Sequence, residues 1–279
     1  MLTILNVVQY SRFMNEERAL ITGASSGIGE TFARVLAARG EDLVLVARSA
    51  GKLDALGADL TARHNVRVDV VPADLSHRDA TDGIVAELAT RGIAIGTLVN
   101  NAGFGTYGEF APLDAARERD EIFVNVVAPV VLTRALLPAM LERGHGAIVN
   151  VASTAAFQPV PFMATYGATK AFVLSFSEAL AEEVRARGVR VVALCPGQTE
   201  TAFFSGLDEA RAPGRARTSE QVVATALRAL ERGQVVAIDG FANYLLANVG
   251  RFSPRWAVAR ITARMFRPAT SPGNPARAS

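Results

Sequence analysis

Short apolar runs alternate along this chain with longer stretches in which apolar residues recur every three or four positions. The short runs lie at residues 19–22, 43–47, 66–71, 97–100, 147–152, 189–195 and 235–238. Several are continuously apolar, which is typical of parallel strands that are buried on both faces. The longer stretches, at about 28–38, 50–63, 76–91, 114–142, 164–187 and 219–232, have the period of helices.

Strands that alternate with helices predict an α/β fold, a doubly wound (Rossmann) parallel sheet of about seven strands. No repeat or linker divides the chain, so we assign residues 18–240 to a single domain. Residues 1–17 are interpreted as an N-terminal extension, and residues 241–279 as a basic amphipathic tail that is helical and partly disordered.

A tail helix is predicted to begin at Ser253 as cap with Pro254 in its first turn. It mixes apolar residues with arginines, which permits contact with a membrane surface. Packing on the substrate-binding segment or on a neighbouring subunit is the favoured interpretation.

The overall composition is that of a soluble globular enzyme. Half of the residues are hydrophobic and the formal charge is +2, so no nucleic-acid footprint is indicated. The single cysteine, Cys195, excludes an intramolecular disulfide and favours a reducing, cytoplasmic location. It ends an apolar run and is predicted to be a buried structural thiol.

A glycine-rich segment joins the first apolar run to the first helical stretch. Its glycines follow a G-x-x-x-G-x-G order, which allows a tight turn and brings backbone close to a pyrophosphate at a helix N-terminus. The candidate cofactor-binding residues here are Gly23, Ser25, Ser26, Gly27, Ile28 and Gly29. The alternative is a simple helix entry capped by Ser25 or Ser26.

The residues at the end of the second run favour a dinucleotide cofactor with a 2′-phosphate on its ribose. An acidic residue at this position would bind a ribose 2′-hydroxyl, whereas Arg48 offers a forked cation suited to a 2′-phosphate. NADP(H) is therefore the predicted cofactor, and NAD(H) is the less favoured one. The alternative for Arg48 is a solvated loop charge, which is the favoured interpretation for Lys52.

Two further connections carry candidate cofactor contacts. Asp74, next to Leu75, is interpreted either as an acceptor for the adenine amino group or as the cap of a helix beginning near Ser76. Asn101, Ala102 and Gly103 follow the fourth run, where small residues let backbone approach a ligand. An ordinary turn is the alternative for them.

Tyr166 and Lys170 stand four residues apart and share one face of a predicted helix. A neighbouring ammonium lowers the pKa of a phenol, so the pair is predicted to transfer protons near neutral pH. Ser153 follows the fifth run, at the same predicted edge of the sheet as Gly23 and Asn101.

Together these residues resemble the short-chain dehydrogenase/reductase family, in particular its NADP-preferring bacterial branch. The resemblance covers about residues 18–240 and rests on residues 22–29 and 100–103 together with Asn125, Ser153, Tyr166, Lys170, Pro196, Gly197 and Thr199. It implies that Tyr166 is the acid/base and that Lys170 holds the nicotinamide ribose and lowers the pKa of Tyr166. Ser153 would bind the substrate oxygen, and Asn125 would fix backbone and a water. Pro196, Gly197 and Thr199 would complete the cofactor site, with no metal.

The implied function is NADP(H)-dependent interconversion of a carbonyl and an alcohol. The alternatives are a 3-oxoacyl thioester reductase of lipid metabolism and a non-catalytic NADP-binding redox sensor. The resemblance also implies a homodimer or homotetramer built on the helices at about 114–142 and 164–187.

A small hydrophobic carbonyl or alcohol substrate is expected from the apolar residues beyond the strands. These are Phe104, residues 157–163, Phe203, Phe204 and Leu207, for which packing in a lid is the alternative. The basic segment 211–217 is interpreted as a solvated mobile loop, in preference to a site for an acidic carrier or coenzyme A phosphates.

Overall fold

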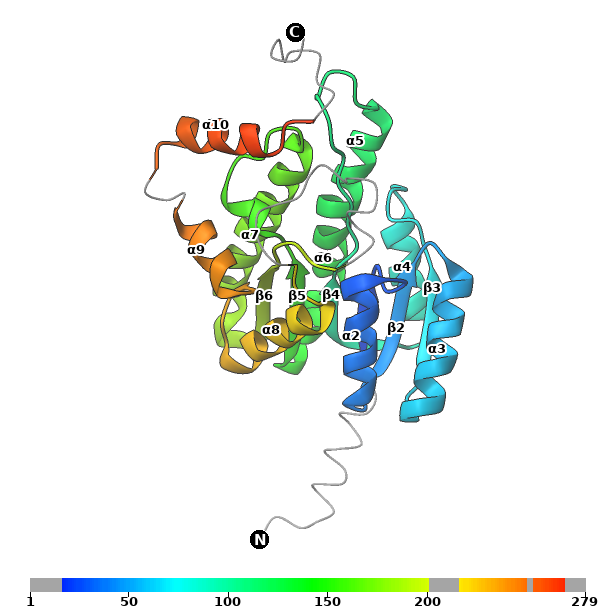
Figure 1. The fold of residues 1–279 in the computed structure, drawn as a ribbon. Coiled ribbons are helices and arrows are strands. Elements are labelled where there is room, and N and C mark those ends of the chain that lie inside the picture. Colours follow the sequence, from blue (N-terminus) through cyan, green and yellow to red (C-terminus); the bar gives the residue numbers. More distant parts are fainter. Residues whose placement is uncertain (1–16, 201–215, 250–252, 269–279) are drawn as a thin grey trace.

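The computed structural model describes residues 17–200, 216–249 and 253–268 (Figure 1). The predicted substrate residues Phe203, Phe204 and Leu207, most of the basic segment 211–217 and most of the N-terminal extension lie outside these ranges.

A seven-stranded parallel sheet forms the centre of the molecule, as predicted. Its strands are β1 (Glu17–Thr22), β2 (Asp42–Ala47), β3 (Val68–Pro72), β4 (Ala94–Asn100), β5 (Gly146–Val151), β6 (Val189–Cys195) and β7 (Val236–Ile238). Their order in the sheet is β3-β2-β1-β4-β5-β6-β7, and every neighbouring pair is parallel. The order reverses between β1 and β4, which is where doubly wound sheets bind ligands.

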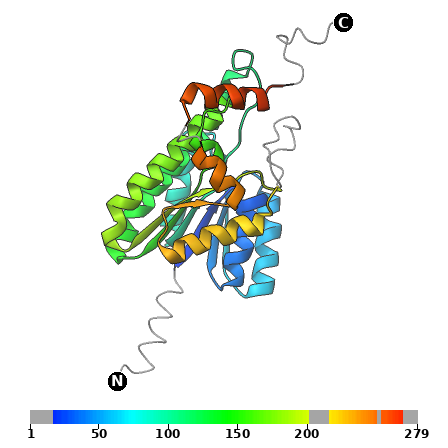
Figure 2. The ribbon, with the colours of Figure 1, turned by 60° about the vertical axis from the view of Figure 1, so that its left-hand side comes forward.

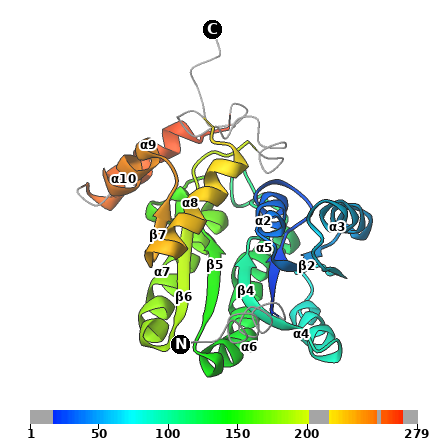
Figure 3. The same ribbon diagram turned by 90° about the horizontal axis from the view of Figure 1, so that it is seen from below.

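Helices cover both faces of the sheet (Figure 3). On one face lie α2 (Gly27–Ala38), α3 (Ala50–His64) and α8 (Ser219–Arg232), whose buried side chains form one core cluster with the strands. On the other face lie α4 (Ala80–Thr90), α6 (Ala128–Arg143) and α7 (Ala164–Val184), and α5 (Ala115–Ile122) packs against α7. Sandwiching the sheet in this way explains why its strands are apolar without alternation. Cys195, at the end of β6, is fully buried, as predicted.

The predicted helix over 114–142 is interrupted. Between α5 and α6, residues Phe123–Val127 form a π-helical turn, labelled η1. The whole segment Ala115–Arg143 is the one helix among the described residues that is long and apolar enough to cross a membrane by length and composition. Its α6 part packs against β4 and β5, which makes it a layer of this fold.

Two helix boundaries differ from the prediction, and one helix was missed. α4 begins at Ala80 rather than near Ser76, because a turn follows β3. α10 (Arg255–Met265) has Pro254 at its N-cap position, so Ser253 is not the cap. A nine-residue helix, α9 (Phe241–Val249), precedes it in the tail. Short 3-10 turns, η2 (Thr154–Phe157) and η3 (Arg185–Arg187), flank α7.

Candidate active site

A cavity of about 960 Å³ opens at the carboxyl ends of the strands, at the upper end of the range for small-molecule sites. Most of the predicted site residues line it: Gly23, Ser25, Ser26, Gly27, Ile28, Arg48, Asp74, Leu75, Asn101, Ala102, Gly103, Ser153, Tyr166, Lys170, Pro196, Gly197 and Thr199. Gly29 and Asn125 are not part of the lining and pack behind it.

The loop before α2 is built for close backbone packing. Gly23 and Gly27 have φ values of +66° and +57°, which favour glycine. A Cβ on Gly29 would lie 2.3 Å from the Gly23 carbonyl oxygen, so Gly29 lets α2 approach the loop and is not a ligand contact. Ser26 occupies the N-cap position without a side-chain cap bond. The first turn of α2 thus borders the cavity with uncapped N–H groups, an arrangement that suits a phosphate.

Asn101 holds this loop against β4. Its carboxamide donates to the carbonyl oxygens of Thr22 (2.9 Å) and Gly23 (3.3 Å). The Thr22 hydroxyl in turn accepts from the N–H groups of Asn101 and Ala102, both at 3.0 Å. The Asn101 side chain therefore supports the cofactor end of the cavity through the backbone.

Arg48 lies exposed at the rim beside the cavity, at the end of β2. Asp74 lies on the neighbouring loop and accepts from the N–H (3.0 Å) and hydroxyl (2.9 Å) of Ser76. Burial raises the pKa of Asp74, but the Ser76 hydrogen bonds and the charge of Arg48 outweigh it and leave the pKa below its ordinary value. Because α4 begins six residues after Asp74, the predicted helix-capping role of this carboxylate is wrong.

Ser153, Tyr166 and Lys170 meet at the end of β5. The Tyr166 phenol and the Ser153 side chain are hydrogen-bonded. The Lys170 ammonium donates to the Val151 carbonyl oxygen at 2.8 Å and lies 5.6 Å from the Tyr166 ring centroid. The helical spacing of Tyr166 and Lys170 thus places both at the cavity, next to Ser153.

The predicted lowering of the Tyr166 pKa is wrong for the protein without bound cofactor. Burial raises the pKa of Tyr166 to about 12, against the opposing hydrogen bond with Ser153, and the charge of Glu121 adds to the rise. Burial also lowers the pKa of Lys170 to about 8. Loss of hydration is the largest cause of both shifts because both side chains are almost fully buried.

Asn125 lies in the π-helical turn η1, behind the lining. Its side-chain oxygen accepts from the Phe104 N–H (3.1 Å), and its amide donates to the Phe104 carbonyl (2.9 Å) and to Thr169 (3.1 Å). These contacts fix the backbone of the loop after β4 against α7, as the resemblance implied. π-turns of this kind recur at functional sites.

The comparisons with known proteins agree with this arrangement. The family model for short chain dehydrogenases matches residues 17–212. The chain is 35% identical to the very-long-chain 3-oxoacyl-CoA reductase of Bos taurus over 252 residues, which are 88% of this chain and 78% of that one. The protein belongs to the short-chain dehydrogenase family. It is therefore an oxidoreductase that interconverts carbonyls and alcohols.

Solved structures of short-chain dehydrogenases superimpose closely. A short-chain dehydrogenase from Sphingobium yanoikuyae in complex with NADPH is 35% identical, with a TM-score of 0.76 over 92% of this chain and 99% of that one. The bulky-bulky ketone specific alcohol dehydrogenase from Comamonas testosteroni is 34% identical, with a TM-score of 0.73 over 85% of this chain and 93% of that one.

A buried pair of carboxyl groups, Glu118 and Glu121, lies near Tyr166 and Lys170 in this short-chain dehydrogenase. Glu121 accepts from the Thr106 N–H (2.8 Å), Glu118 accepts from the Thr165 hydroxyl, and the Thr106 hydroxyl lies between the two carboxyl groups within hydrogen-bond distance of both. Burial raises the pKa of Glu121 to about 7 against these bonds. The pair could not be predicted from the sequence, because both residues lie in a polar stretch that is typical of an exposed helix.

The far end of the cavity is apolar. Val160, Met163 and Tyr166 pack together with Phe266, which follows α10. The Tyr107 hydroxyl donates to the Phe266 carbonyl at 3.0 Å, and Phe104 lies under the Arg117 guanidinium at 4.8 Å. Phe104, Val160 and Met163 thus line the cavity as predicted, whereas Phe157 packs elsewhere, against the core cluster at the end of β6 that includes Cys195. The positions of Tyr107 and Arg117 in the cavity lining could not be predicted, because neither residue belongs to a sequence motif.

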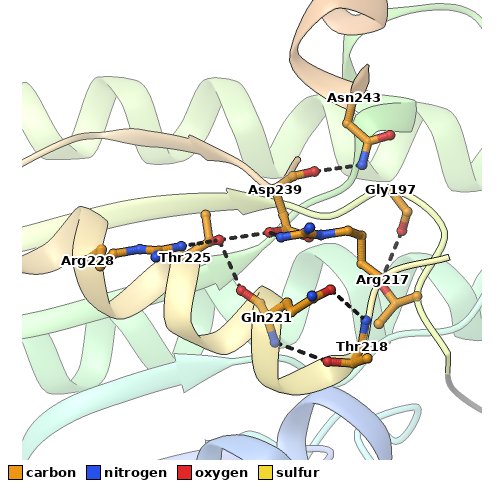
Figure 4. A network of polar contacts seen from close by, with 9 residues as sticks. Gly197, Arg217, Thr218, Gln221, Thr225, Arg228, Asp239 and Asn243 are labelled. Carbon is orange, nitrogen blue, oxygen red and sulfur yellow. Dashed lines mark hydrogen bonds and ion pairs between the residues drawn. The ribbon is translucent and has the colours of Figure 1, made fainter. Parts of the chain in front are cut away.

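A polar network fixes the wall formed by Pro196, Gly197 and Thr199 (Figure 4). Thr199 pairs with Arg217 in a parallel bridge, and Arg217 forms an ion pair with the fully buried Asp239 at 2.9 Å. Asn243 of α9 donates to the Asp239 carbonyl, and its amide would lie 2.4 Å from a Cβ at Gly197, so a side chain there would have to displace it. The interpretation of segment 211–217 as a solvated loop is therefore wrong for Arg217, whose guanidinium stabilises the fold by pairing with Asp239.

Proposed function

We propose that this protein reduces a ketone flanked by bulky apolar groups to the secondary alcohol. The observation that carries the proposal is the meeting of Ser153, Tyr166 and Lys170 beside an apolar end of the cavity. A neutral phenol next to a serine hydroxyl offers two donors to a carbonyl oxygen, which is what stabilises the charge that develops there during reduction.

The cofactor is NADP(H), which supplies or takes the hydride when bound. The residues present fit it from end to end. Arg48 and Ser49 border the cavity where a 2′-phosphate would lie, and the first turn of α2 suits the pyrophosphate. The buried Lys170 ammonium has three N–H donors, and its bond to Val151 leaves others to hold ribose hydroxyls.

The protonation state of Tyr166 suits reduction. With its pKa raised to about 12, the phenol is neutral at pH 7 and donates its proton to the substrate oxygen. Ser153 donates to the same oxygen and orients the phenol. Lys170 bears a positive charge below about pH 8, which stabilises the phenolate left after the transfer.

Support for a bulky ketone comes from the apolar cluster at Val160, Met163 and Phe266 and from the ketone-specific relative. A second candidate is a 3-oxoacyl thioester. Similarity to 3-oxoacyl-CoA reductases over most of the chain favours it, as does Arg117, a cation in the cavity lining that suits an anionic carrier group.

A homodimer or homotetramer built on α5, α6 and α7 also belongs to this proposal. Ile122 and Phe172 are exposed on these helices, and Phe172 stacks on Phe176 with ring centroids 6.0 Å apart. Burial of these side chains in a subunit contact would account for their exposure.

Initial rates with NADPH and NADH over aryl and alkyl ketones, steroids and 3-oxoacyl thioesters test the proposal. We expect NADPH to be preferred and diaryl or steroid ketones to give the highest kcat/KM. Faster turnover of the thioesters would select the second candidate. NADPH binding without turnover of any carbonyl would instead select the redox-sensor interpretation.

A further inference from the structure

Exposed apolar side chains are concentrated on the two tail helices. Among the described residues, ten large apolar side chains are exposed, and seven of them lie on α9 or α10. They are Phe241, Tyr244, Leu245 and Leu246 on α9 and Trp256, Ile261 and Met265 on α10. Trp256 is 63% exposed and Phe241 is 76% exposed, although large aromatic residues are normally covered.

The charge of this region has one sign. The sequence contains six arginines and no acidic residue after Asp239. Arg255, Arg260, Arg264 and Arg267 are exposed on or beside α10, and none of them has an ion-pair partner among the described residues. Arg260 instead lies over the Trp256 ring, 5.0 Å from its centroid. The surface therefore combines apolar side chains with uncompensated positive charge.

The opposite side of α10 packs on the rest of the protein. Thr262 donates to the Pro159 carbonyl at 3.1 Å, and Phe266 packs on the apolar end of the cavity. Figures 1 and 2 place α10 beyond the carboxyl ends of the strands, with α9 between it and the sheet. The exposed side of the two helices thus faces away from the protein, next to the apolar end of the active site.

We propose that the exposed sides of α9 and α10 bind the surface of an anionic lipid bilayer. Short helices with tryptophan, aliphatic residues and arginines on the exposed side lie in the interface between headgroups and acyl chains. At eleven residues, α10 is too short to span a bilayer. In this position the apolar end of the cavity opens next to the phase in which a hydrophobic substrate dissolves.

A second copy of the chain fits this surface less well. A twofold contact between identical surfaces would bring the arginines of α10 against those of its partner. Like charges facing each other across a contact are unfavourable, whereas anionic headgroups neutralise them.

Flotation of the full-length protein with vesicles tests the proposal independently of catalysis. We expect binding to vesicles of phosphatidylcholine mixed with phosphatidylglycerol, weaker binding to phosphatidylcholine alone, and loss of the difference at high salt. Each arginine at an anionic surface contributes about fivefold in partitioning. The double substitution Arg260→Gln, Arg264→Gln should therefore weaken binding roughly thirtyfold.

The matched control is Arg185→Gln, Arg187→Gln. It removes the same charge from η3, which follows the C-terminal end of α7, whereas Tyr166 lies near the N-terminal end. It should bind vesicles like the wild type, and both variants should keep NADPH-dependent reduction of a water-soluble ketone. A second variant, Leu245→Ser with Leu246→Ser, should weaken binding to both vesicle types. Equal losses in Arg185→Gln, Arg187→Gln would overturn the proposal. So would wild-type protein that does not float, or a self-association that the α9 and α10 variants abolish.

Discussion

The catalytic edge of the sheet and the α9–α10 surface treat polar and apolar groups in opposite ways. At the carboxyl edge of the sheet, Tyr166, Lys170 and Glu121 are buried and each is hydrogen-bonded within the fold, and their pKa values are shifted by loss of hydration. On the α9–α10 surface, arginines and aromatic residues lie in solvent, and these arginines form no ion pair with any residue that the structure describes. The first arrangement suits the proposed control of a proton, and the second suits the proposed contact with a lipid surface.

Tyr166→Phe should produce the largest effect at the catalytic edge. Removing a positioned general acid costs about 10²–10⁴-fold in kcat. The affinity for NADPH, measured by fluorescence titration, should change little, because Lys170 keeps its place through Val151.

Tyr107→Phe is the matched control for this substitution. Tyr107 also lines the cavity, but its hydroxyl is used by the Phe266 carbonyl. A loss of kcat in Tyr107→Phe as large as that in Tyr166→Phe would show that Tyr166 is not the specific proton donor.

Arg217→Met should give the largest loss of stability. It leaves the fully buried Asp239 carboxylate without its cation, which costs about 3 kcal/mol in the free energy of unfolding. Urea unfolding measures this cost.

The comparison is Arg185→Met, which breaks the exposed pair with Glu182 and should cost less than about 1 kcal/mol. Similar midpoints for the two variants would contradict the structural role given to Asp239. Because the network backs Gly197, Arg217→Met should also raise the KM for NADPH.

Arg48→Ala should raise the KM for NADPH roughly 10- to 100-fold and leave the KM for NADH unchanged. A hydrogen bond between a guanidinium and a phosphate is charge-assisted, and only NADPH has the 2′-phosphate. Lys52→Ala, one turn further along α3, is the control and should stay near the wild type. An equal rise for both cofactors in Arg48→Ala would assign this arginine a general structural role.

Glu121 should make stability depend on pH. Its pKa is raised from 4.5 to about 7 in the folded protein, so the unfolded chain loses this proton at lower pH than the folded one. The free energy of unfolding should therefore fall as the pH rises from about 4.5 to 7.

Glu121→Gln resembles the protonated carboxyl and should remove this contribution. The variant should match the wild type at low pH and exceed it by about 1–3 kcal/mol above pH 7. Urea unfolding at several pH values measures the difference. A slope that persists unchanged in Glu121→Gln would place the titrating group elsewhere.

The sequence predicted the catalytic edge better than the tail for physical reasons. Every strand was found because a strand covered on both faces leaves a continuous apolar run, and motifs at strand ends share one edge by topology. The direction of the Tyr166 pKa could not be predicted, because spacing gives the neighbour of a side chain but not its burial. For the same reason Glu118 and Glu121 were missed: most of their polar helix is exposed, and only these two carboxyl groups are buried, where they bond Thr106 and Thr165 from elsewhere in the chain.

The tail was harder to predict, because its apolar residues do not mark a side of a helix that faces the core. α9 has apolar residues on its exposed side, so its periodicity does not mark an inward face. Arg217 illustrates the same limit. Within a basic segment it reads as a solvated charge, and only its buried partner Asp239, from the end of β7, gives it a structural role.

Transfer of deuterium from NADPH labelled at the transferring nicotinamide carbon tests the central claim most directly. With a bulky aryl ketone, we expect an alcohol that carries one deuterium on its carbinol carbon, formed rapidly by the wild type and slowly by Tyr166→Phe. Tight NADPH binding with no deuterium in the product from any ketone or 3-oxoacyl thioester would contradict it.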